Sequence, residues 1–122
     1  MICAANGART EGHDFFYVLH GAVRIDGWER TGIGGLEAID EITMVCVPDL
    51  MSALNSGMIN EEQMRAVQTA IIGHCELMGD RMAILDAPPG LKPQEVKEWR
   101  VNTARYDSKF ATLYYPWIEV MD

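Results

Sequence analysis

Short apolar runs separated by turn residues are the strongest pattern in the chain. The run at 42–47 is rich in β-branched residues and stops at Pro48, and the run at 81–85 stops shortly before two prolines. Parallel strands that are buried on both faces have this composition, so we expect two buried core strands. A third run at 110–115 is aromatic and ends at Pro116, and the pattern resumes over 117–120. It predicts a third strand.

A helical stripe lies between the first two strands. Asn60 is placed to cap a helix together with Gln63, and Gly79 is placed to end it. The apolar residues that recur at helical spacing between these ends are Met64, Val67, Ile71, Cys75 and Met78. Because both ends and the stripe agree, the sequence predicts a helix from 60 to 78.

A second, shorter helix is predicted between the second and third strands. Pro93 suits its first turn, and its packing stripe comprises Val96, Trp99 and Thr103. The element order is then strand, helix, strand, helix, strand. A βαβαβ unit of this kind closes with right-handed crossovers, so the predicted fold class is α/β, with a three-stranded, mostly parallel sheet and covering helices.

The first 40 residues differ from the rest. They are rich in glycine and charge, and their apolar pieces at 15–19 and 22–25 predict two short strands at most, with one helical turn at 36–39. We therefore expect an irregular N-terminal region over 1–40 and an α/β core over 41–122. The core stops directly after an aromatic strand that would need neighbours, which predicts a chain truncated at its C-terminus.

The net charge and the cysteines limit the partners and the compartment that we expect. The formal net charge is −8 and the pI is near 4.7, which argues against nucleic acid and against anionic membranes as partners. No apolar stretch approaches the length of a membrane span, and the first residues lack the pattern of a secretory signal. Three cysteines without a C-x-x-C spacing favour a reducing cytoplasm over a disulfide framework or a zinc site.

Two aspartates are the best candidates for chemistry. Asp49 and Asp86 each follow a predicted parallel strand at its carboxyl end, where α/β proteins gather ligands, and two carboxylates could hold Mg²⁺. The alternative is that each aspartate caps free backbone N–H groups at the start of a loop, which is the commoner role there. We expect the capping role, and we keep a small Mg²⁺-dependent phosphotransfer or hydrolytic domain as the alternative function.

The other residues considered for binding or catalysis are expected to have structural roles only. Gly32, Gly34 and Gly35 lack the spacing of a phosphate-binding loop, so we expect an ordinary flexible turn there. His74 and Cys75 are adjacent and would point about 100° apart on a helix. We expect Cys75 in the core and His74 at the boundary with solvent. Common hydrolase signatures are missing, and we predict no enzyme, no cofactor and no metal.

The aromatic residues Tyr114, Tyr115 and Trp117 have two interpretations. Large aromatic side chains suit a core strand, and they equally suit an interaction surface. Taken one by one, we expect them to pack in the core.

The stretch at 108–118, with the sequence SKFATLYYPWI, resembles the most recognisable motif of the contractile tail sheath proteins of bacteriophages and related injection systems. Similarity to this family extends over about residues 21–121, and includes the first core strand and the segment from Asp80 to Asp86. The residues that carry the likeness are Ser108, Leu113, Tyr114, Tyr115, Pro116, Trp117, Asp80, Arg81 and Asp86.

The resemblance implies a structural subunit without a reaction. Sheath subunits polymerise into a helical tube around an inner tail tube, and contraction of the tube drives injection. The partners implied are other sheath subunits, the inner tail tube protein and the baseplate. The implied location is the cytoplasm during assembly and then the tail of a virion or injection particle.

Overall fold

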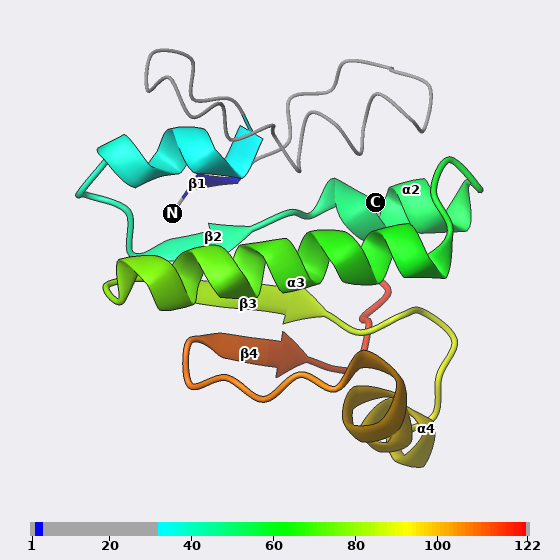
Figure 1. The fold of residues 1–122 in the computed structure, drawn as a ribbon. Helices are drawn as coiled ribbons and strands as arrows, with labels where there is room; N and C mark the ends of the chain where they lie inside the picture. Colours follow the sequence, from blue (N-terminus) through cyan, green and yellow to red (C-terminus); the bar gives the residue numbers. More distant parts are fainter. Residues whose placement is uncertain (1, 4–31, 122) are drawn as a thin grey trace.

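A computed structural model describes residues 2–3 and 32–121 of the chain (Figure 1). Four strands form one parallel sheet in the order β1-β2-β3-β4. Their bounds are Ile2–Cys3 for β1, Met44–Cys46 for β2, Met82–Asp86 for β3 and Ala111–Tyr114 for β4. The predicted α/β class and the three core strands are confirmed. The expected continuation at 117–120 is wrong, because no strand forms there.

Five helical elements accompany the described strands. They are the 3₁₀ helix η1 at Gly32–Ala38, α2 at Asp49–Asn55, α3 at Glu61–Met78, α4 at Pro93–Glu98 and the π-helical turn η2 at Trp99–Ala104. The predicted loop at the glycine run is wrong, since those glycines belong to η1. The short helix α2 was not predicted.

Helix α3 follows the sequence signals closely. Asn60 and Gln63 exchange hydrogen bonds of 2.8 and 3.0 Å between side chain and backbone, which satisfies two free N–H groups at the first turn. Gly79 ends the helix with a φ of 70°, a left-handed conformation that glycine adopts without steric cost. The predicted stripe is buried, with Met64 and Cys75 fully enclosed, except for its last residue Met78, which is half-buried.

The second predicted helix changes type halfway along. Val96 and Trp99 are buried as expected, but Thr103 is exposed. The reason is the π-helical turn η2, in which hydrogen bonds span five residues, so each turn contains more residues than in an α-helix. Residues after Trp99 are thereby rotated away from the α-helical stripe.

Among the described residues, helices cover one face of the sheet. Its strands follow each other in sequence order, so right-handed crossovers place the connecting helices on the same side, and Figure 1 shows α3 lying across the front. Val45, Ala83 and Leu85 face these helices and are at most 2% exposed. Met44 and Met82, which alternate with them, are 38% and 41% exposed. The expectation of strands buried on both faces is therefore wrong for the described chain.

We call the side of the sheet opposite α3 the open face. It is made by the alternate side chains of the three longer strands, which stand in register across the sheet. These side chains are Met44, Cys46, Met82, Ile84, Asp86, Thr112 and Tyr114.

The predicted strands at 15–19 and 22–25 and most of the expected region 1–40 lie outside the described residues. Among the residues that the structure describes, no helix combines the length and the apolar character needed to cross a membrane.

Candidate functional site

The predicted site residues gather at the two ends of strand β3. Asp80 and Arg81 come just before it, whereas Asp86 is its last residue and lies beside Tyr114 of β4. A strand of five residues spans roughly 17 Å. The structure therefore divides the predicted residues into two groups, and we describe each in turn.

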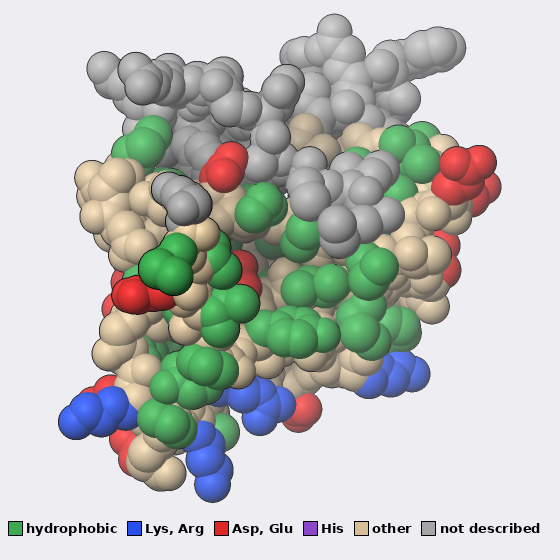
Figure 2. Space-filling model, turned by 180° about the vertical axis from the view of Figure 1, so that it is seen from behind, with side chains coloured by type: hydrophobic (Ala, Val, Ile, Leu, Met, Phe, Trp, Pro, Cys, Tyr) green, Lys and Arg blue, Asp and Glu red, His purple; other side chains and the backbone are tan. Residues whose placement is uncertain are grey.

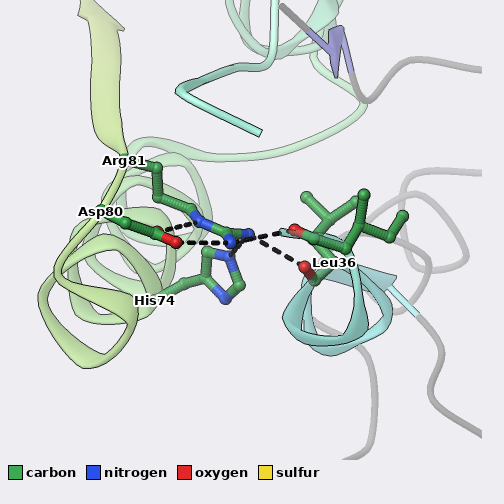
Figure 3. A network of polar contacts seen from close by, with 5 residues as sticks. Leu36, His74, Asp80 and Arg81 are labelled. Atoms are coloured by element: carbon green, nitrogen blue, oxygen red, sulfur yellow. Dashed lines mark hydrogen bonds and ion pairs between the residues drawn. The ribbon is translucent and has the colours of Figure 1, made fainter. Parts of the chain in front are cut away.

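At the amino end of β3, Arg81 ties three segments together (Figure 3). Its guanidinium donates hydrogen bonds to the backbone oxygens of Leu36 at 2.9 Å, within the last turn of η1, and of Ile39 at 3.0 Å, just after η1 ends. It also donates to the Asp80 carboxylate at 2.8 Å, and this pairing holds the pKa of Asp80 below its usual value. The Arg81 side chain is fully enclosed, so its charge depends on these partners.

His74 completes this group from helix α3. Its Nε2 atom lies 3.3 Å from Nη1 of Arg81. A guanidinium can only donate, so Nε2 must accept and the imidazole is neutral with its proton on Nδ1. Burial and then the charge of Arg81 lower the pKa of His74, while Glu37 and Asp80 oppose this shift.

The position of His74 corrects a prediction. We expected it at the boundary with solvent, but it is 6% exposed. The reason is that η1 packs on the end of α3 and covers a second side of that helix (Figure 1). His74 is buried against Arg81. The sequence identified Arg81 only as the first residue of an apolar run, so this contact was not predicted.

At the carboxyl ends of β3 and β4, the aromatic motif meets the sheet. Asp86 and Tyr114 are partners across the two strands, and the backbone N–H of Ala87 donates to the backbone oxygen of Tyr114 at 3.4 Å. The chain then turns through a cis bond between Tyr115 and Pro116. The indole N–H of Trp117 donates to the Ala87 oxygen at 2.8 Å, which anchors the last residues against the end of β3.

The aromatic side chains lie at the surface. Tyr114 is 60% exposed, Tyr115 39% and Trp117 49%. Our expectation that each packs in the core is therefore wrong, because the motif lies at the open end of the sheet and no described helix covers it. Ser108 has a local role before β4, where its hydroxyl oxygen accepts a hydrogen bond from the N–H of Phe110 at 3.2 Å.

Two linked hydrogen bonds that end at the backbone of Asp86 were not predicted from the sequence. Tyr106 donates from its hydroxyl to the Gln68 side-chain oxygen at 2.8 Å, and the Gln68 amide donates to the backbone oxygen of Asp86 at 2.9 Å. Gln68 is 1% exposed, and burial raises the pKa of Tyr106 to about 12. The one sequence signal for these hydrogen bonds was that Gln68, a polar residue, directly follows Val67 of the apolar stripe.

The two aspartates proposed for Mg²⁺ have different surroundings. Asp86 is half-buried, its pKa is raised by burial, and it borders a cavity of about 10 Å³ at the ends of β2 and β3. A cavity of this size holds about one water molecule. Asp49 is exposed at the start of α2 and does not line that cavity. Among the described residues, no group of three or more His, Cys, Asp or Glu side chains is placed to hold a metal ion.

Cys75 is fully buried, as predicted for a small core residue, and burial raises the pKa of its thiol to about 11. A thiol with such a pKa is almost entirely protonated near neutral pH and is a poor nucleophile.

Comparison with known proteins adds no relative. No protein-family model matches the chain, and no curated protein matches it at a significant level.

Proposed function

We propose that the chain is a structural subunit, or part of one, of a contractile tail sheath. In this role it packs with other sheath subunits into a helical tube around an inner tail tube, attached to a baseplate, in a virion tail or injection particle assembled in the cytoplasm. The observation that carries the proposal is the stretch 108–118, whose order of serine, small residues and Leu-Tyr-Tyr-Pro-Trp resembles the sheath motif.

The placement of this motif supports the proposal. Tyr114, Tyr115 and Trp117 expose large aromatic surfaces at the carboxyl end of the sheet, and Met82 is 41% exposed at the amino end. Aromatic and methionine side chains are enriched where proteins meet each other, and contiguous exposed apolar surface marks such sites. A subunit that functions by packing needs a surface of this kind, whereas a small enzyme needs a cleft with converging polar groups.

Immunogold labelling of contractile particles tests the proposal. An antibody raised against the purified chain is applied to particles from cells that carry the gene, before and after contraction. We expect gold along the whole length of the tail, and no gold when the antibody is first absorbed with the purified chain. Particles with intact sheaths that carry no gold, or gold confined to the head, would refute the role.

The alternative function is a small Mg²⁺-dependent phosphotransfer or hydrolytic domain that uses Asp49 and Asp86. The observation that favours it is the half-buried carboxyl of Asp86 at the carboxyl edge of a parallel sheet. Titration calorimetry with Mg²⁺ separates the two functions. The sheath role predicts no binding isotherm, and an isotherm that disappears in Asp86→Asn but not in the exposed Asp107→Asn would support the alternative.

A further inference from the structure

Helix η1 packs on α3 without a fully buried side chain of its own among the described residues. Ile33 and Leu36 are partly buried against the core, and the main described contact of η1 is with α3. Segments with few buried apolar side chains open locally at a lower free-energy cost than global unfolding. The polar contacts that hold η1 against the rest of the chain therefore matter for how often it opens.

Arg81 provides two of these polar contacts. Its guanidinium donates to the backbone oxygens of Leu36 and Ile39 at 2.9 and 3.0 Å. In Figure 3 the guanidinium lies between η1 on one side and His74 with Asp80 on the other. Arg81 is 2% exposed and His74 6%. Little water reaches either side chain, so the protein itself must supply their partners.

His74 fits this arrangement only as a neutral imidazole. Its Nε2 atom lies 3.3 Å from Nη1 of Arg81, and a guanidinium can only donate. Protonation adds an N–H at Nε2, which sets two donors and two positive charges against each other. The contact then becomes repulsive in a place with little water to screen it.

The acidic groups nearby do not cancel this repulsion. Asp80 already accepts from Arg81 at 2.8 Å and is 47% exposed, so the guanidinium and water share its charge. Burial and then the charge of Arg81 lower the pKa of the imidazole by more than Glu37 on η1 and Asp80 raise it. Asp40, which follows η1, acts on Arg81, and the adjacent Cys75 is uncharged near neutral pH because its pKa is about 11.

We propose that this cluster makes the docking of η1 sensitive to acid: protonation of His74 releases η1 from α3 while the sheet and α3 stay folded. In the docked state the imidazole is neutral and accepts from Arg81. In the released state it is charged and solvated, and the oxygens of Leu36 and Ile39 bind water. Helix α3 keeps its cap at Asn60 and its buried stripe in both states. The inference does not depend on the sheath role.

The direction of the pH dependence follows from proton linkage. A released and solvated His74 titrates near the ordinary value of about 6.5, whereas the docked residue has a lowered pKa. The released state therefore binds the proton more tightly. Its share rises as the pH falls below about 6.5 and stops rising below the pKa of the docked state.

Hydrogen exchange measured by mass spectrometry at about pH 7.5 and about pH 5.5 tests the release, with rates corrected for the pH dependence of the chemical step. We expect the opening constant of peptides that cover 32–39 to rise at least about threefold at the lower pH. Peptides that cover 61–72 in α3 are the internal reference, and they should keep their protection.

Two variants identify the group responsible. His74→Gln keeps an acceptor for Arg81 but cannot become charged, so its η1 should open equally at both pH values. Glu76→Gln is the matched control, because it removes an exposed titratable group from α3 two residues away. This control should respond to pH as the wild type does, and circular dichroism melts check that both variants fold.

An NMR titration of the wild-type imidazole makes the test independent of any variant. We expect the Nδ1–H tautomer of His74 at neutral pH and a titration midpoint below that of histidine in a short peptide. The amide signal of Leu36 should change over the same pH range. An imidazole with the ordinary midpoint, or one that titrates while the Leu36 signal stays unchanged, overturns the proposal.

The exchange data can overturn it as well. Opening of 32–39 that is independent of pH refutes the acid-sensitive release. Opening that rises equally in His74→Gln excludes His74 as its cause. A rise that 61–72 shares would mean global unfolding in place of local release, and it would also refute the proposal.

Discussion

Replacing Arg81 by methionine removes the guanidinium that joins η1 to the end of α3 and keeps most of the apolar stem. Two backbone oxygens, of Leu36 and Ile39, lose a charged donor at 2.9 and 3.0 Å. Hydrogen bonds to a charged group contribute about 1.5–3 kcal/mol each, and relief of the buried charge offsets part of that. We expect a net loss of about 2–3 kcal/mol in the free energy of unfolding.

Urea unfolding followed by circular dichroism measures this loss, and the slope of the transition should not change because the core stays intact. Arg81→Lys should be intermediate, since one ammonium cannot span both carbonyl oxygens as a planar guanidinium does. The exposed Arg100→Met is the control, expected within about 0.5 kcal/mol of the wild type. An Arg81→Met variant as stable as this control would refute the structural role of the network.

Three further predictions concern other positions. His74→Gln keeps an acceptor for the neighbouring guanidinium but cannot titrate. Because the folded pKa of His74 is lowered, the wild type should lose stability relative to this variant as the pH falls below about 6.5, with no difference in slope above that value, in urea unfolding at several pH values. Gly79→Ala should destabilise by about 1 kcal/mol because alanine is strained at a φ of 70°, whereas Gly73→Ala, inside α3 with open space around it, should stabilise by about 0.5–1 kcal/mol; thermal melts that show the same sign for both would contradict the assigned conformations. Tyr106→Phe leaves the buried oxygen of Gln68 without its donor and should cost about 1–2 kcal/mol in the same melts, and an unchanged melting temperature would argue against that hydrogen bond.

The sequence predicted the elements whose signals are local. Helix α3 has a cap at Asn60, an apolar stripe and a glycine at 79, and each of these acts within a few residues of its own position. The three core strands are apolar runs limited by proline or by turn residues. Their positions were correct to within two residues at each end, which is the usual uncertainty of element boundaries.

Features that depend on what packs against an element could not be predicted in this way. Helix α2 has seven residues, and its burial depends on contact with α3. The burial of His74 depends on η1 reaching the end of α3. Exposure of the aromatic motif depends on the order of the strands. That order decides which face the crossovers cover, and neither spacing nor composition reports it.

The composition of the open face supports an interface that forms and dissociates. A face permanently in contact with water would carry polar side chains, and a face permanently buried would carry branched apolar ones. The rows across this sheet are mixed: Met44 with Met82 at one end, and Asp86 with Tyr114 at the other. Methionine is flexible enough to fit more than one partner surface, and tyrosine combines apolar area with a hydroxyl that tolerates water. The proposed sheath role, in which neighbouring subunits slide past each other, would require such side chains, because each contact must be broken without leaving an insoluble surface.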